Sequence, residues 1–205
     1  MRRCSRRCCS TITWSRLSAL LLAGALAIAG CGGGPKFRST DITGADFGKS
    51  LELKGHDGKP RTLADFRGKL VVLFFGYTHC PDICPTTLAD VAGVMKALGK
   101  DAARVQVLFV TLDPERDTAE VLSKYVPAFD PAFLGLYGDA AATERAAKEF
   151  KIFYEKRPGS APGAYAVDHS AQCYVLDAQG KLRLLVRNDR IAQDLADDLR
   201  VLLAG

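Results

Sequence analysis

The segment LVVLFFGYTHCPDICPTTLADVAGVMKAL, residues 70–98, decides the fold of this chain. Its first six residues are all apolar, which is typical of a central strand that is buried on both faces. Residues 85–98 carry apolar side chains at helical spacing and are followed by Gly99, so they are predicted to form an amphipathic helix. Cys80 and Cys84 lie between these two elements. We therefore expect two thiols at the point where a buried strand leads into a helix.

Each of the two cysteines is followed by a proline, and a proline ring disfavours helical geometry in the residue before it. We therefore expect Cys80 in a loop and Cys84 as the cap residue of a helix that begins at Pro85. The free N–H groups and the positive end of a helix lower the pKa of a nearby thiol. Both sulfurs are thus predicted to be exposed and readily ionised, which indicates either thiol redox chemistry or the binding of a soft metal.

The remaining sequence alternates between predicted strands and helices. We expect further strands at residues 105–112 and 133–137, helices at 118–125, 140–154 and 191–203, a helical turn at 62–66, a mobile loop at 157–163, and a β-hairpin formed by 165–176 and 181–186. This order predicts an α/β fold in which helices flank a mixed central sheet and the chain ends in a β-hairpin and a helix. A dithiol placed between the first long buried strand and a helix is similar to the arrangement in the thioredoxin superfamily.

Residues 1–30 are predicted to be a signal peptide that is not part of the fold. Five arginines accompany an apolar run at 17–30, which is too short to span a bilayer comfortably. The run ends directly before Cys31 in a pattern that resembles a bacterial lipobox, so we expect Cys31 to carry lipid; an uncleaved membrane anchor is the alternative. Residues 31–44 would then be a flexible tether and residues 45–205 one thioredoxin-like domain. The protein would be exported and held at a membrane, facing the periplasm or the cell exterior.

The charge of the chain changes once this segment is set aside. The whole sequence has 28 Lys and Arg residues against 23 Asp and Glu residues, a formal net charge of +5. The five arginines of the predicted signal peptide account for the excess, so residues 31–205 contain 23 residues of each sign. The basic pI therefore gives no support to binding of nucleic acid, which needs a clustered basic face.

The spacing of the two cysteines favours metal binding over disulfide exchange. Thioredoxin-type oxidoreductases have two residues between their cysteines and a proline opposite them, whereas this chain has three intervening residues and His169 in the corresponding stretch, 167–170. A disulfide remains sterically possible. Two thiolates and one imidazole form a soft ligand set that suits copper, above all Cu(I) with Cu(II) as a second state, and zinc accepts the same set. Asp168 is the expected hydrogen-bond partner of a metal-bound His169.

Two further histidines and one further cysteine are not expected to be metal ligands. His79 should point away from the metal, because adjacent side chains in a tight loop rarely point the same way. His56 is expected in a turn. Cys173 follows His169 by four residues and is expected on the same face of a strand as a small core residue; a fourth ligand or a resolving thiol are the alternatives.

Residues 77–87, 112–118 and 167–170 together resemble the SCO/SenC family, and the resemblance covers residues 45–205. It implies a thioredoxin-like fold and a membrane-tethered copper protein. The implied role is delivery of copper to the dinuclear CuA centre in subunit II of cytochrome c oxidase, or to another periplasmic copper protein. Reduction of the disulfide in the apo form of the CuA centre is the second role that the resemblance implies.

The same resemblance assigns roles to individual residues. In that family the two cysteines of the motif and a distant histidine bind copper, which corresponds to Cys80, Cys84 and His169 in this sequence. Asp113 and Asp168 match acidic positions near the site. The chain departs from the family pattern in its tether, which is expected to be a lipid rather than a transmembrane helix. It also has Cys173 where an apolar residue is expected, a difference that leaves the number of redox-active thiols open.

A copper metallochaperone and a thiol–disulfide reductase are therefore the two competing functions. In the second, the same pair of thiolates would attack a disulfide of a partner protein, with Cys80 as the more exposed nucleophile. The two roles are compatible, because oxidation of Cys80 and Cys84 to a disulfide would abolish metal binding.

Overall fold

The computed structural model describes residues 35–159 and 162–205. The predicted signal peptide and Cys31 lie outside these residues, so both stay predictions. Residues Phe37–Gly205 form one compact unit. Within the described part of the chain, no helix has both the length and the apolar character that crossing a membrane requires.

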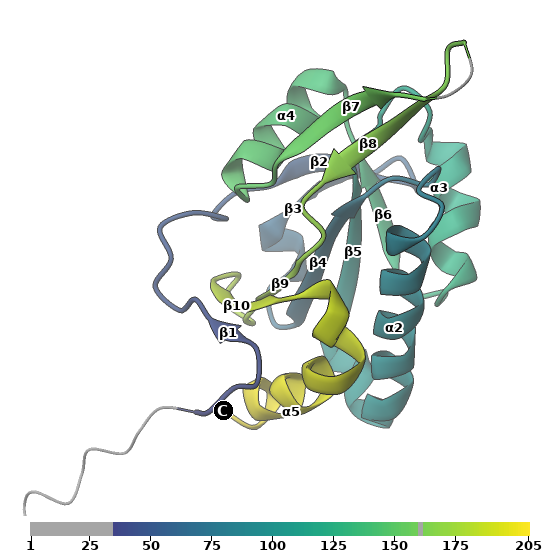
Figure 1. Cartoon of the computed structure of the whole chain (residues 1–205). Coiled ribbons are helices and arrows are strands. Elements are labelled where there is room, and N and C mark those ends of the chain that lie inside the picture. Colours follow the sequence, from purple (N-terminus) through teal and green to yellow (C-terminus); the bar gives the residue numbers. More distant parts are fainter. Residues whose placement is uncertain (1–34, 160–161) are drawn as a thin grey trace, which may run out of the picture. The chain divides into compact units, whose positions relative to one another are not determined.

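The centre of this unit is a mixed sheet of eight strands with the order β1-β10-β9-β4-β5-β6-β2-β3 (Figure 1). Its strands are β1 (Thr40–Asp41), β2 (Glu52–Gly55), β3 (Pro60–Thr62), β4 (Leu70–Gly76), β5 (Val105–Thr111), β6 (Leu134–Tyr137), β9 (Cys173–Leu176) and β10 (Leu182–Val186). β5 pairs in parallel with β4 and with β6, whereas the remaining pairs are antiparallel. The predicted α/β fold with a mixed sheet, similar to thioredoxin, is confirmed.

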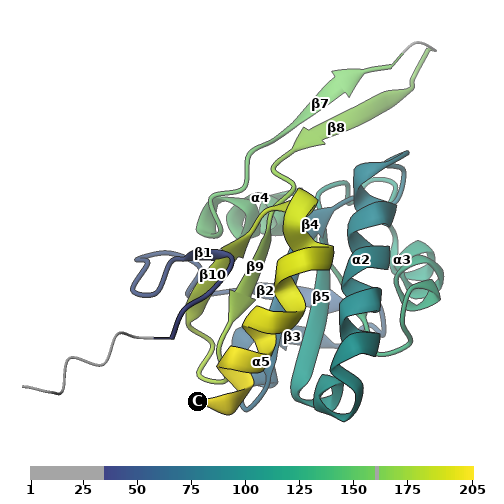
Figure 2. The same cartoon turned by 60° about the horizontal axis from the view of Figure 1, so that its bottom comes forward.

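The core forms around β4, in which every residue is buried. Two helices, α2 (Ile83–Leu98) and α5 (Ala196–Ala204), lie side by side over one face of the sheet (Figure 2). Two others, α3 (Ala119–Tyr125) and α4 (Ala140–Glu149), contact β6 and β2 respectively. A strand that is covered in this way on both faces needs apolar side chains at every position, which is why its sequence shows no alternation.

The β-hairpin expected near the end of the chain is only partly correct. β9 and β10 do pair with each other, but residues 165–169 belong to a separate strand, β8 (Tyr165–His169). β8 pairs with β7 (Tyr154–Pro158) in a second, two-stranded sheet at one end of the fold (Figure 1). The loop expected at 157–163 begins too early, because residues 157 and 158 belong to β7; residues 160 and 161 lie outside the described residues.

The helix expected at 140–154 is shorter than the sequence suggested. α4 ends at Glu149, and Lys151 adopts a left-handed backbone conformation with φ of 52°. The N–H group of Ile152 donates to the carbonyl oxygen of Ala147 at 2.8 Å, which closes the helix end. The chain then turns away, so Tyr154 begins β7 instead of completing the helix.

The folded part begins before the boundary that was expected at residue 45. β1 pairs with β10, and the N–H groups of Arg38 and Ser39 donate to the buried carboxylate of Asp198 at 2.7 and 2.9 Å. A buried carboxylate is stabilised by such donors, so these residues are fixed to the fold.

The helix that was expected to close the chain is confirmed as α5, and a π-helical turn at Ile191–Leu195 precedes it.

Candidate metal centre

The cysteine motif follows the end of β4, where Gly76 makes the close approach of α2 possible. A Cβ atom at Gly76 would lie 2.8 Å from the Sγ atom of Cys84 and 2.9 Å from the ring of Phe109. These distances are shorter than van der Waals contact, so a side chain there would push Cys84 away. Glycine is therefore required at the point where the strand passes the sulfur.

The helix after the motif begins at Ile83, two residues before the predicted start, so Cys84 lies in its first turn and not at its cap. Asp82 occupies the cap position without a side-chain capping bond. The helix can include Cys84 because Pro85 is in the first turn, where a missing N–H group costs no intrahelical hydrogen bond.

The prediction that both sulfurs are exposed and readily ionised is wrong for Cys84. Its side chain is fully buried, and this burial raises the pKa of the thiol well above its ordinary value of 9.0. Cys80, in contrast, is half-buried, and its Sγ atom accepts the N–H group of Cys84 at 3.5 Å. The two thiols thus differ in environment, with one reachable from solvent and one enclosed by the core.

His169 comes from the end of β8 and meets this pair of thiols. Its Nε2 atom lies 3.4 Å from the Sγ atom of Cys84. Its Nδ1 atom lies 2.9 Å from the carbonyl oxygen of Ser170, which only accepts hydrogen bonds, so Nδ1 carries the proton and Nε2 presents a lone pair to Cys84. Burial lowers the pKa of His169 below 6.5, which keeps the imidazole neutral near pH 7.

Two aromatic rings fix the position of this imidazole. The ring of Tyr77 packs edge-on against that of His169, with centroids 5.9 Å apart and an interplanar angle of 85°. The ring of Phe74 lies 6.2 Å away on a tilted plane. Because Phe74 and Tyr77 belong to β4 and to the residues directly after it, the strand that leads to the cysteines also supports the histidine.

One ligand atom each from Cys80, Cys84 and His169 lies within 4.8 Å of the other two. No other group of three or more such ligands occurs within residues 35–159 and 162–205. Two sulfurs and one neutral imidazole nitrogen at these separations fit a soft ion of low coordination number, and Cu(I) is the ion that this set favours. The predicted convergence of the three residues is thus present in the structure.

The two acidic residues expected beside the site, Asp113 and Asp168, do not contact the metal-binding side chains. Asp168 does not hydrogen-bond to His169; its exposed carboxylate pairs with Arg157 at 3.1 Å. The charge of Asp168 acts on His169 only by favouring its protonated form, a smaller effect than burial. Asp113 is buried and accepts the hydroxyl group of Tyr165 on β8 at 2.7 Å. It therefore contacts the strand that carries His169 rather than the histidine itself.

Sequence reasoning did not single out Asp117, which is fully buried beside the motif. Its carboxylate accepts the N–H group of Thr78 at 3.0 Å, the hydroxyl of Thr78 at 2.5 Å and the hydroxyl of Thr111 at 2.6 Å. These bonds fix the loop that leads to Cys80. The signal in the sequence is the charged run at 113–117, which directly follows an apolar strand and so lies at the same sheet edge as the motif.

The remaining histidines and the third cysteine lie outside the three-residue cluster. The imidazole of His79 is half exposed and hydrogen-bonds the hydroxyl of Thr78 at 3.1 Å, as expected for a residue that points away. His56 accepts the N–H group of Gly135 at 3.0 Å through Nδ1. Cys173 begins β9 and is fully buried, and burial raises the pKa of its thiol to about 12. Since β8 ends at His169, these two residues are not on one strand.

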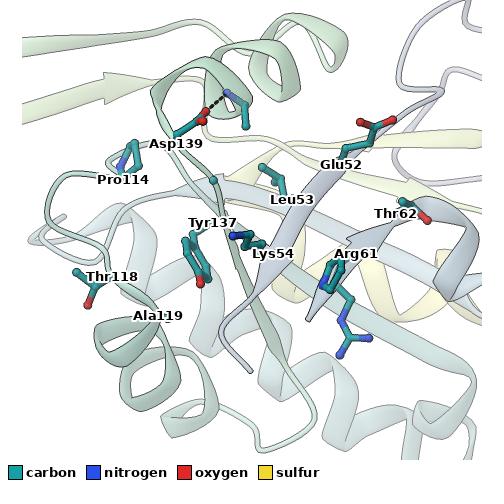
Figure 3. A pocket seen from close by; sticks show the side chains of 13 residues that line it. Glu52, Leu53, Lys54, Arg61, Thr62, Pro114, Thr118, Ala119, Tyr137 and Asp139 are labelled. Carbon is teal, nitrogen blue, oxygen red and sulfur yellow. Dashed lines mark hydrogen bonds between the residues drawn. The ribbon is translucent and has the colours of Figure 1, made fainter. Parts of the chain in front are cut away.

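A cavity of about 700 Å³ lies elsewhere, beside β2 and the first turns of α3 and α4 (Figure 3). Leu53, Tyr137, Thr118 and Asp139 are among its lining residues. None of the residues that line it is a cysteine or a histidine. The metal-ligand cluster and this cavity are therefore separate features.

The sequence of this chain is similar to that of proteins in a known family. A family model described as SCO1/SenC matches residues 39–204. The mitochondrial SCO2 homolog of Mus musculus is 37% identical over 152 residues, which is 73% of this chain but 60% of that protein. This chain thus spans less than two thirds of the length of that relative.

Solved structures of Sco proteins are also similar to this chain in sequence and in fold. The ScoI protein of Bradyrhizobium japonicum, solved with copper bound, is 36% identical with a TM-score of 0.70, covering 76% of this chain and 99% of that one. The apo Sco1 protein of Thermus thermophilus, a solution structure, is 39% identical with a TM-score of 0.72, covering 85% of this chain and 100% of that one.

Proposed function

Because this chain belongs to the SCO1/SenC family, we propose that it is a copper metallochaperone that holds one copper ion through Cys80, Cys84 and His169. The observation that carries the proposal is the spacing of the three ligand atoms, which lie within 4.8 Å of one another. Cu(I) prefers such a soft set of two sulfurs and one nitrogen, and the same residues accommodate Cu(II) as a second state. The copper is cargo, so the site must both bind it and release it.

The half-buried Cys80 supports a role in transfer. An acceptor's ligand can approach the metal from the side of Cys80, whereas Cys84 is fully buried and the half-buried ring of His169 packs against Tyr77 and Phe74. Exchange would then proceed one ligand at a time, with Cys80 released first and Cys84 last. We propose that the acceptor is the CuA centre in subunit II of cytochrome c oxidase or a similar copper protein, since the Sco family is described as one of cytochrome c oxidase assembly proteins.

The first residues of the sequence support a proposal for the location of the protein. We propose that residues 1–30 are a signal peptide and that Cys31 carries lipid, which would hold the domain at a membrane on its periplasmic or exterior side. Residues 32–36 would connect this anchor to the folded unit that begins at Phe37. Mass spectrometry of the protein isolated from membranes tests this, with a lipid mass on an N-terminal Cys31 as the expected result.

Titration of the reduced protein with Cu(I) against a chromophoric chelator tests the ligand assignment. Cys80→Ser and Cys84→Ser should abolish tight binding, and His169→Ala should weaken it by about one to two orders of magnitude. Matched controls are Cys173→Ala, which removes the third thiol, and His79→Ala, which removes an exposed imidazole beside Cys80. Equal losses in the controls would contradict the assignment.

A second function, reduction of a partner's disulfide, is favoured by the unequal environments of the two thiols. The thiolate of Cys80 would attack one sulfur of the partner's disulfide and release the other as a thiol, forming a mixed disulfide. Cys84, after losing its proton, would then attack the Sγ atom of Cys80 and release the second partner thiol. The partner gains two electrons and this chain ends as the Cys80–Cys84 disulfide. Fast turnover of a model mixed disulfide by the metal-free protein would support this role.

A further inference from the structure

The hairpin that carries His169 has few contacts of its own to keep it in place. β7 and β8 form a two-stranded sheet apart from the main one, and an isolated pair of strands is marginally stable in water. In β8 only Val167 is fully buried, and four of the five residues of β7 are exposed. The position of the hairpin must therefore depend on the surface against which it lies.

Arg116, in the loop between β5 and α3, contacts this hairpin through both its charge and its planar guanidinium. Its guanidinium carbon lies 3.6 Å from the ring centroid of Tyr165, the first residue of β8. The same guanidinium donates through Nη1 to the carbonyl oxygen of Tyr165 at 3.0 Å. It also lies 5.8 Å from the ring centroid of Tyr77, the ring that packs against His169. One side chain thus contacts both the strand that carries the histidine and the ring that supports it.

Asp113, at the start of the same loop, binds both Arg116 and Tyr165. Its buried carboxylate accepts the Nε–H of Arg116 and, through the other oxygen, the hydroxyl of Tyr165 at 2.7 Å. Burial, followed by this hydrogen bond, raises the pKa of Tyr165 to about 12, so the hydroxyl stays a donor. Charge-assisted bonds of this kind are stronger than neutral ones, and the planar guanidinium can stack and donate at once.

The opposite end of the same loop holds the cysteine motif. Asp117 accepts both the N–H group and the hydroxyl of Thr78, two residues before Cys80. Within five residues, the loop 113–117 therefore contacts the two segments that supply the ligands: the cysteine loop through Asp117, and β8 through Arg116 and Asp113. No other segment within the described ranges has side-chain hydrogen bonds to both Thr78 and Tyr165.

We propose that the loop 113–117 sets the distance between His169 and the two sulfurs, and that Arg116 is a positioning residue that acts on the metal through the β7–β8 hairpin. The proposal rests on the copper-binding role given above. With Arg116 in place, the hairpin is fixed and the imidazole is ready for the metal before it arrives. Without it, the hairpin opens locally while the main sheet stays folded, and each binding event must first order the histidine.

Two measurements on the full chain test this, one without metal and one with it. The variants are Arg116→Lys, which keeps a positive charge beside buried Asp113, and Tyr165→Phe, which removes only the hydroxyl. The matched control is Arg157→Gln, an arginine of the same hairpin whose ion pairs with Glu155 and Asp168 are exposed. In the reduced, metal-free protein, hydrogen exchange is followed for amides of β7 and β8, with amides of β4 and β5 as the internal reference.

In both test variants, the hairpin amides should exchange about tenfold faster while those of β4 and β5 are unchanged. The control should change hairpin exchange less than about twofold. Unchanged hairpin exchange in Arg116→Lys and in Tyr165→Phe would overturn the proposal, as would an equal increase in β4 and β5, which would indicate general unfolding.

The second measurement is a double-mutant cycle for Cu(I) affinity. Arg116→Lys should weaken binding about tenfold in the natural chain but less than about twofold when His169→Ala is already present, because its effect passes through the histidine. An equal loss in both backgrounds would overturn the role of Arg116 as a positioning residue. If the natural chain binds no Cu(I), the proposed function fails, and the exchange experiment still decides whether the loop holds the hairpin.

Discussion

The Nε2 atom of His169 lies 3.4 Å from the Sγ atom of Cys84, although 85 positions separate the two residues in the sequence. Cys84 is fixed by the first turn of α2, and His169 by the end of a hairpin that lies outside the main sheet. The contact joins a rigid part of the fold to a part with few buried residues. The affinity of the site should therefore depend on both chemistry at the sulfurs and the position of the hairpin.

Cu(I) binding should become stronger as the pH rises from about 7 to about 8. Burial raises the pKa of Cys84, so its thiol carries a proton at neutral pH that the metal must displace. Each displaced proton strengthens the apparent affinity about tenfold per pH unit. His169 releases no proton in this range, because its pKa is lowered by burial. Competition titrations at several pH values measure the slope, and an affinity that does not vary with pH would contradict the protonated state of Cys84.

Gly76→Ala should disturb the metal site and the fold together. The new methyl group would lie 2.8 Å from the Sγ atom of Cys84, so either the sulfur or the strand must move. We expect a loss of about 1–3 kcal/mol in the free energy of unfolding, together with weaker Cu(I) binding. Gly93→Ala in α2 is the matched control, since a Cβ atom there meets no atom within 4 Å. That control should be neutral or slightly stabilising in denaturant titrations, and equal behaviour of the two variants would contradict the steric argument.

Asp117→Asn should destabilise the protein more than Asp168→Asn does. Asp117 is buried and accepts three hydrogen bonds, and the amide nitrogen of asparagine would face donors instead of accepting from them. We expect a loss of about 1–3 kcal/mol in the free energy of unfolding. Asp168 is exposed and pairs only with Arg157, so its substitution should stay within about 0.5 kcal/mol. A larger effect of Asp168→Asn on either stability or Cu(I) affinity would restore the role that the sequence suggested for it.

Thiol-specific alkylation of the native, metal-free protein should modify Cys80 before the other two cysteines of the fold. Cys84 and Cys173 are fully buried, and burial raises the pKa of both thiols. Peptide mapping after short exposure to iodoacetamide measures the order. Early modification of Cys173 would show that it is reachable and would support the alternative of a third redox-active thiol.

The parts of the fold that follow one local pattern could be predicted from the sequence. The apolar run of β4 and the helical periodicity of α2 are properties of adjacent residues, and so is the position of the thiols between them. β7 could not be predicted in this way. Its sequence, YEKRP, contains one aromatic residue and three charged ones, and it becomes a strand only because β8 lies beside it.

The ligand set could be predicted, but the environment of each ligand could not. His169 was identifiable because it occupies the stretch where related folds have a proline, whereas the burial of Cys84 depends on Gly76 and Phe109 from two strands of the sheet. The hydrogen-bond partner of His169 is the carbonyl oxygen of Ser170, a backbone group that no side-chain pattern reveals. The role of Arg116 depends likewise on a hairpin whose existence the sequence did not indicate.

X-ray absorption at the copper edge of the reduced, Cu(I)-loaded protein tests the central claim most directly. The account predicts one copper per chain with two sulfur ligands and one nitrogen ligand, and loss of the nitrogen alone in His169→Ala. A spectrum with two sulfurs and no nitrogen in the natural chain, or one that His169→Ala leaves unchanged, would contradict it.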